Sequence, residues 1–172
     1  PAGFVPGHPI AGTEKSGVDA SFAELFKERR VILTPTANTR EDATAKVRAM
    51  WEAAGAEVVE MDVFHHDEVL AATSHLPHVL AFTLVDTLSR MDEHPEIFDF
   101  AAGGFRDFTR IASSDPTMWR DICLSNSEAI LAVLDRYTEE LDTLAAAIRS
   151  GEGEAVLESF QRAKAARDKF CG

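Results

Sequence analysis

The chain has 172 residues, enough for one good core or for one helical domain plus part of another, and its 45% hydrophobic and 27% charged residues are ordinary for a globular protein. Its 17 Lys and Arg against 29 Asp and Glu give a net charge of −12, so we expect neither nucleic acid nor an anionic membrane as a partner. Two cysteines without metal-like spacing, no signal-peptide pattern and no uninterrupted apolar run near the ~20 residues of a bilayer span predict a soluble, cytoplasmic protein.

The first motif is a polar, glycine-rich loop at the end of a short strand. An apolar pair, Phe4 and Val5, leads into this strand, which we expect to end at His8 because Pro9 has no amide hydrogen for a sheet. The loop continues to Gly17, and catalytic groups often lie in such loops. From composition alone, a structural turn with a surface histidine is an equal alternative.

The next forty residues have the pattern of a small α/β unit. We expect a short amphipathic helix over 19–27 and a β-branched strand over 30–34. A longer helix should begin after Thr39 as N-cap and end at Gly55, followed by a strand over 56–61.

From about residue 65 the strand patterns disappear. A helix over 66–91 is apolar on more than one face, and Pro77 predicts a kink near 73–77. Further helices are expected over 105–113, from Asp115 with a break at 125–127, and over 154–170. This part has more apolar helix surface than it can bury alone, so we expect helix pairing between subunits.

The predicted fold is therefore mainly α with a small α/β part. Residues 1–62 are the end of a doubly wound sheet, and 63–172 form an all-helical domain. No G-x-G-x-x-G fingerprint follows a strand, since Gly103 and Gly104 lack its spacing and setting.

Three motifs in the same order resemble the prephenate and arogenate dehydrogenases of tyrosine biosynthesis. They are residues 8–17 (HPIAGTEKSG), 74–78 (SHLPH) and 103–121, which begins GGFRDFTRIA. Members of this family carry the dinucleotide fingerprint in an N-terminal domain and form a homodimer through the helical domain. The resemblance thus implies a C-terminal portion that lacks most of the nucleotide-binding domain.

The resemblance implies oxidative decarboxylation of prephenate to 4-hydroxyphenylpyruvate, with hydride transfer to NAD or NADP. Arogenate is the alternative substrate, and tyrosine is a candidate inhibitor. Without the fingerprint, we expect this chain alone to be inactive. The alternative function is a non-catalytic dimerisation or tyrosine-sensing helical module.

The family positions also imply site residues. His8 is the expected catalytic base toward the ring hydroxyl, because a neutral imidazole suits that proton transfer. Arg110 matches the position that binds the ring carboxylate. Arg106, one helical turn earlier, either assists it or is a solvated surface arginine or a partner of Asp107.

Four further positions complete the expected substrate site and its surroundings. Glu14 and Asp107 match acidic positions that place or gate the basic groups, although Glu14 could instead cap a helix. Trp119 lies near the pocket or is plain core, and His78 lies on the pocket wall, where the family recognises the substrate side chain and tyrosine.

The remaining expectations concern the cofactor and the other histidines. Gly7 and Pro9 beside His8 are candidates for contact with the cofactor, whose main site we expect outside this chain. We expect His75 to pack between helices, and the pair of His65 and His66 to lie at an exposed helix start. A metal site at His75 and His78 is not expected, because no cysteine joins them and Pro77 disturbs the spacing.

Overall fold

The computed structural model describes residues 1–12, 17–91, 94 and 96–171. It divides into two compact units, Pro1–Ile130 and Leu131–Gly172. The first holds a three-stranded sheet and several helices, and the second consists of helix. The predicted fold class, mainly α with a small α/β part, is confirmed.

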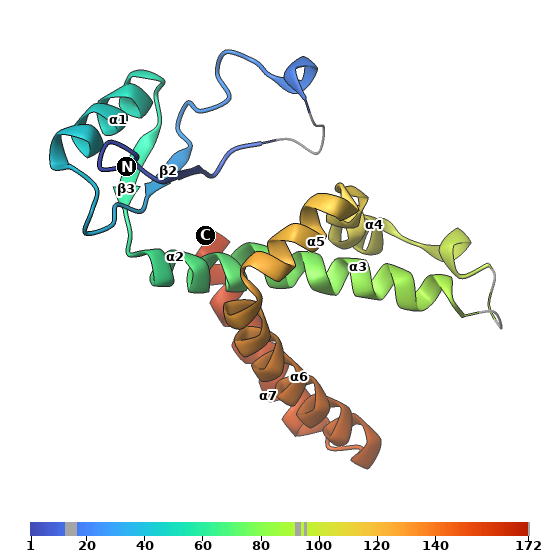
Figure 1. Ribbon diagram of the computed structural model, residues 1–172. Coiled ribbons are helices and arrows are strands. Elements are labelled where there is room, and N and C mark those ends of the chain that lie inside the picture. Colours follow the sequence, from blue (N-terminus) through green and yellow to red (C-terminus); the bar gives the residue numbers. More distant parts are fainter. Residues whose placement is uncertain (13–16, 92–93, 95, 172) are drawn as a thin grey trace. The chain divides into compact units, whose positions relative to one another are not determined.

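The sheet has the strand order β1 (Gly7–Pro9), β2 (Arg30–Leu33) and β3 (Glu57–Glu60). β1 is antiparallel to β2, whereas β2 and β3 are parallel and are joined through helix α1 (Glu41–Ala53) (Figure 1). Buried side chains of β2 form a core against which α1 and the segment before β2 pack, through Val31, Leu33, Val47, Trp51 and Phe26. These elements form one β–α–β unit, as the pattern predicted.

Two local expectations in this unit are wrong. Residues 19–27 do not form a helix but a single 3₁₀ turn, η1 (Val18–Ala20), followed by turns. Phe26 packs on Trp51 while Phe22 stays 53% exposed, so too little burial supports the costly first turn of a helix. Helix α1 has Arg40 as its N-cap, because the Thr39 hydroxyl instead accepts a hydrogen bond from the amide of Thr36.

A long, interrupted helix follows. It comprises α2 (Val63–Leu70), a π-helical turn η2 (Ala71–His75) and α3 (Leu76–Ser89) (Figure 1). Asp62 caps its start, accepting hydrogen bonds from the amides of Phe64 and His65. The π turn lies just before Pro77, whose missing amide hydrogen leaves the ladder incomplete, so the predicted distortion is confirmed.

The same stretch, Val63–Ser89, is the one described helix that is long and apolar enough to cross a membrane by length and composition alone. A central helix of a soluble protein meets the same criterion. The observation is therefore weak evidence for a membrane span.

Short helices then follow α3 in the chain. They are η3 (Ile97–Phe100), α4 (Gly103–Thr109), η4 (Arg110–Ser113) and α5 (Pro116–Ser125). Both α4 and η4 contact α3 (Figure 1). Asp115 caps α5 as predicted, since its Oδ1 accepts from the amide of Met118 at 2.8 Å.

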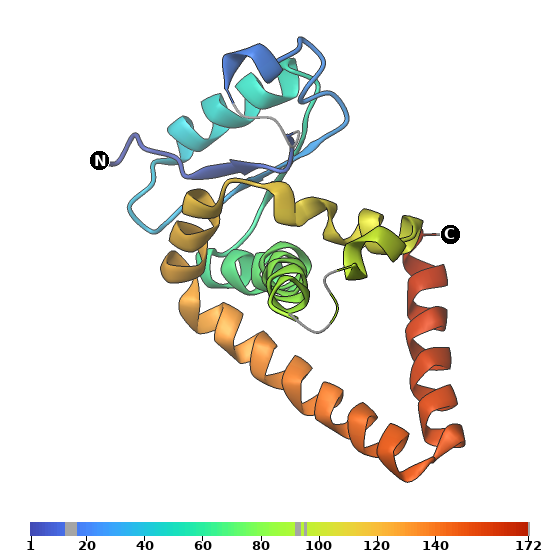
Figure 2. The same ribbon diagram turned by 90° about the vertical axis from the view of Figure 1, so that its right-hand side faces the viewer.

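The second unit contains most of α6 (Ser127–Ser150) and all of α7 (Gly153–Cys171), with the predicted break before α6 and a turn at Gly151. The two helices diverge from this turn (Figure 2). Large apolar side chains on both remain exposed: Leu131, Tyr137, Leu141, Ile148, Leu157, Phe160 and Phe170. The excess apolar surface predicted for this part is therefore present.

Gly55 offers a test of the α/β unit. It has φ +84°, and a Cβ there would lie 3.4 Å from the backbone of Lys27. We predict that Gly55→Ala lowers the free energy of unfolding by about 1 kcal/mol or more, because alanine is strained at positive φ. Urea denaturation measures this, with Gly3→Ala as control, since Gly3 has open space around it. Equal stability of the two variants would contradict the prediction.

Candidate functional site

A chain of hydrogen bonds connects the sheet with the long helix. His8 on β1 and His66 on α2 have their Nδ1 and Nε2 atoms 3.0 Å apart, with rings edge to face at 5.3 Å. The other ring nitrogen of His66, Nδ1, donates to Oδ1 of Asp67 at 2.8 Å. Residues 58 positions apart are thus joined through side chains.

The expected exposure at the start of the helix is confirmed for His65 and is wrong for His66. The sequence predicted both His65 and His66 at an exposed helix start. The side chain of His65 is exposed, and its Nδ1 lies 3.8 Å from Oε2 of Glu68. The side chain of His66, by contrast, is only 17% exposed. Successive residues of a helix point about 100° apart, so one of two adjacent histidines can turn toward His8 while the other faces solvent.

Asn126, between α5 and α6, extends the network. Its Nδ2 donates to the backbone carbonyl of Asp67 at 2.9 Å and lies 3.2 Å from Nδ1 of His75. Because the amide nitrogen only donates, the Nδ1 of His75 accepts, and its ring proton is on Nε2. Sequence patterns gave no signal for Asn126, since its partners lie more than fifty residues away.

A stacked pair lies next to His75. The rings of His78 and Trp119 are 3.6 Å apart and nearly parallel, and His75 meets Trp119 edge-on at 6.1 Å. His78 Nδ1 donates to the carbonyl of Ser74 at 2.8 Å, which leaves its Nε2 as an acceptor. Trp119 is buried, and its Nε1 has no hydrogen-bond partner among the described residues.

Three of these histidines resist protonation. Burial lowers the pKa of His8, and the charge of His66 lowers it further. The pKa of His75 is lowered by burial and by the nearby histidines. Burial also lowers the pKa of His78, as does the positive charge of Arg110, against the raising effect of the Ser74 carbonyl. All three imidazoles are therefore neutral near pH 7.

The other predicted site residues differ in how they relate to this cluster. Arg110 on η4 is exposed and close enough to affect His78 electrostatically. Arg106 and Asp107 are exposed on α4, and within the described part of the chain neither makes a hydrogen bond or ion pair with the cluster. Glu14 lies outside the described residues.

Gly7 and Pro9 flank His8 on β1, paired with Leu33 and Val31 of β2. Such pairing fixes the strand that carries His8. In residues 1–12, 17–91, 94 and 96–171, no group of three or more His, Cys, Asp or Glu side chains is arranged to hold a metal ion.

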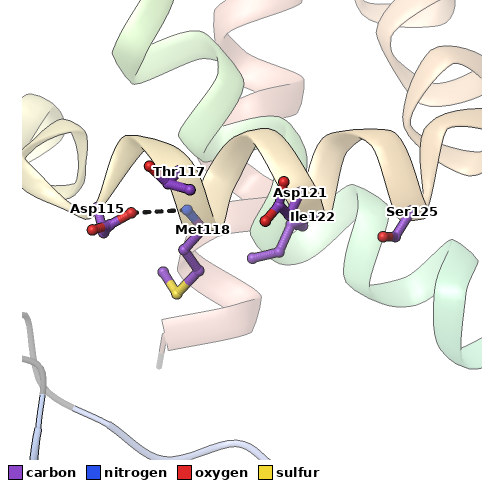
Figure 3. A pocket seen from close by; sticks show the side chains of 6 residues that line it. All are labelled: Asp115, Thr117, Met118, Asp121, Ile122 and Ser125. Atoms are coloured by element: carbon purple, nitrogen blue, oxygen red, sulfur yellow. Dashed lines mark hydrogen bonds between the residues drawn. The ribbon is translucent and has the colours of Figure 1, made fainter.

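A separate hollow lies along α5 (Figure 3). It is lined by one side of that helix: Asp115, Thr117, Met118, Asp121, Ile122 and Ser125. None of the predicted site residues lines it, and it is open to solvent. The histidine cluster, with Trp119 and Arg110, is therefore the better candidate site, because it combines neutral acceptors, an aromatic wall and a cation.

Family models match nearly the whole chain. Residues 1–60 match the nucleotide-binding domain of prephenate dehydrogenase, and residues 62–162 match its dimerization domain. These two matches define a dehydrogenase architecture of two domains. The chain belongs to the prephenate dehydrogenase family, and the resemblance inferred from the motifs is confirmed.

Individual relatives agree. The chain is 47% identical over 166 residues to a cyclohexadienyl dehydrogenase of Zymomonas mobilis, covering 95% of this chain and 57% of the relative. It is 41% identical to prephenate dehydrogenase of Bacillus subtilis, covering 96% of this chain and 45% of that protein. The chain thus spans about half the length of the curated relatives it matches.

Solved structures show the same fold. Prephenate dehydrogenase from A. aeolicus, in complex with hydroxyphenyl propionate and NAD+, superimposes with a TM-score of 0.90 at 44% identity. The match covers 97% of this chain and 59% of that one. Arogenate dehydrogenase from Synechocystis gives a TM-score of 0.84 at 28% identity, covering 98% of this chain and 62% of the other.

The lowered pKa values predict a pH dependence of stability. A histidine with a lower pKa in the folded state binds fewer protons there than in the unfolded chain. We therefore expect the free energy of unfolding to fall as the pH drops below about 6.5. Urea denaturation between about pH 7.5 and pH 5 measures this. His78→Gln should flatten the dependence, and the exposed control His65→Gln should not. Identical slopes for all three proteins would contradict the prediction.

Proposed function

We propose that this chain provides the substrate side of a prephenate or arogenate dehydrogenase of tyrosine biosynthesis. The reaction is oxidative decarboxylation of the ring, giving 4-hydroxyphenylpyruvate from prephenate. The observation that carries the proposal is the neutral His8, held in a histidine network in a chain of this family.

His8 is the proposed catalytic base. The substrate hydroxyl loses its proton to His8 as a hydride leaves the carbon that bears the hydroxyl, and the ring carboxylate departs as carbon dioxide. A histidine whose pKa is lowered is unprotonated at neutral pH and is ready to accept this proton. NAD or NADP, when bound, accepts the hydride.

Little of this chain fits a dinucleotide. The sequence holds no G-x-G-x-x-G after a strand, so a glycine turn for the pyrophosphate is not among its residues. Gly7 and Pro9 beside His8 are the proposed contribution to the cofactor site. We accordingly expect no turnover from this chain by itself.

Arg110 is the proposed clamp for the ring carboxylate. A guanidinium holds a carboxylate with two parallel hydrogen bonds, and a local cation is needed in a chain whose net charge is −12. Arg106 precedes Arg110 by four residues, on α4, and is a candidate for the second carboxylate. Glu14 and Asp107 remain proposed acidic partners that place these cations.

His78 and Trp119 are proposed to form the wall that meets the substrate side chain. Their stacking fixes both rings, and the Nε2 of His78 offers an acceptor. Tyrosine, which shares the 4-hydroxyphenyl ring and the side-chain carboxylate of 4-hydroxyphenylpyruvate, is the proposed inhibitor at the same wall. The choice between prephenate and arogenate rests with these contacts.

We further propose a domain boundary near residue 62, a homodimer formed through the helical domain, and a cytoplasmic location. The exposed apolar side chains of α6 and α7 support the dimer, because a second copy would cover them. The second candidate function, a dimerisation or tyrosine-sensing module without catalysis, is favoured by the same surface.

The substrate proposal predicts binding by this chain. We expect isothermal titration with prephenate to show binding that Arg110→Ala abolishes, because the clamp for the ring carboxylate is lost. The control Arg149→Ala removes an arginine near the end of α6, outside the proposed site, and should bind like the wild type. Titration with tyrosine tests the inhibitor proposal in parallel. Absence of prephenate binding by the folded wild-type chain would contradict a substrate site within these residues.

The dimer proposal predicts a mass of two chains in solution. Leu141 is 50% exposed on α6, so Leu141→Asp should leave the fold of one copy intact while placing a charge in the interface. Light scattering after size exclusion should show two copies for the wild type and one for Leu141→Asp. Circular dichroism checks that the variant is folded, and Glu139→Ala on the same helix is the control. A single-copy mass for the wild type would contradict the proposal.

A further inference from the structure

The hydrogen bonds around His66 restrict where protons lie. An aspartate carboxylate accepts hydrogen bonds, so the proton between Asp67 and His66 is on Nδ1 of His66. A neutral imidazole carries one proton, so Nε2 of His66 has a lone pair. The 3.0 Å contact then needs a donor on His8, which is its Nδ1. The lone pair of His8 is left on Nε2.

The contacts around His66 restrict the protons of both imidazoles to these positions. The imidazole of His66 has little freedom, since its side chain is mostly buried and both of its nitrogens are engaged. Asn126 binds the backbone carbonyl of Asp67 and so ties down the residue at the far end of the chain of hydrogen bonds. The opposite order, with the proton of neutral His8 on Nε2, would set two lone pairs against each other at 3.0 Å.

We propose that His66 and Asp67 are positioning residues for His8, which hold its ring in the Nδ1-protonated form with the Nε2 lone pair available to substrate. The role in catalysis rests on the proposed function, whereas the proton arrangement does not. Neither residue is among those that the sequence motifs assign to the site.

The proton balance of the step is simple. The O–H bond of the substrate hydroxyl breaks and an N–H bond forms at Nε2 of His8, which becomes an imidazolium. Its Nδ1 proton stays on His8 and continues to donate to Nε2 of His66. The negative charge of Asp67, two hydrogen bonds away, favours the new positive charge without receiving a proton.

One alternative gives the reverse arrangement. If His66 were doubly protonated against Asp67, it would donate from Nε2 to His8, and the proton of His8 would be on Nε2. His8 would then present a donor, and not an acceptor, to a substrate hydroxyl. The two arrangements predict opposite tautomers of His8, so they can be distinguished directly.

The test uses this chain labelled with ¹⁵N in histidine. Long-range ¹H–¹⁵N correlation spectra at neutral pH report which nitrogen of each ring is protonated. We expect His8 to be protonated on Nδ1 in the wild type. Asp67→Ala should convert it to a mixture of both tautomers, because His66 is then free to change its own. Asp67→Glu should retain part of the wild-type form.

Glu68→Gln is the matched control, since Glu68 is adjacent in sequence and contacts exposed His65. It should leave His8 unchanged. Protonation of wild-type His8 on Nε2, or an unchanged tautomer in folded Asp67→Ala, would overturn the proposal. The proposed function fails independently of this proposal. Prephenate titration can show no binding while His8 is protonated on Nδ1, and it can show binding while His8 is protonated on Nε2.

Discussion

The hydrogen bond between His8 and His66 is the contact on which the candidate site depends. It joins a strand of the small sheet to the first turns of the long helix, across 58 positions of sequence. Through Asp67 and Asn126 the same network reaches the junction of α5 and α6. A loop histidine without such partners would change its ring orientation and tautomer freely, whereas here both are restricted by groups on separate elements.

The long helix positions the rest of the site through its irregularity. Pro77 cannot complete the hydrogen-bond ladder, and a π turn over Ala71–His75 takes up the extra residue. The Ser74 carbonyl accepts from His78, and His78 in turn stacks on Trp119. The interrupted helix therefore orients the ring of His78 against Trp119 of α5.

Nearby positive charges and burial both lower the pKa values of the histidines at this site. The histidines are kept neutral by burial, by one another and, for His78, by Arg110. A chain of net charge −12 repels anions at long range, so any anionic substrate must be held by short-range contacts with local cations.

The sequence by itself determined the fold class, most helices, the kink near Pro77 and the family, because helical periodicity, capping residues and linear motifs are local signals. From the family resemblance it placed His78 and Trp119 near the same pocket, but it did not predict that their rings stack. It failed at residues 19–27, where packing did not support a helix, and at His66, taken for a surface residue. Only the tertiary structure decided that His66, Asp67 and Asn126 meet His8 and His75. Contacts between residues fifty or more positions apart depend on how the chain folds back, and no spacing in the sequence encodes them.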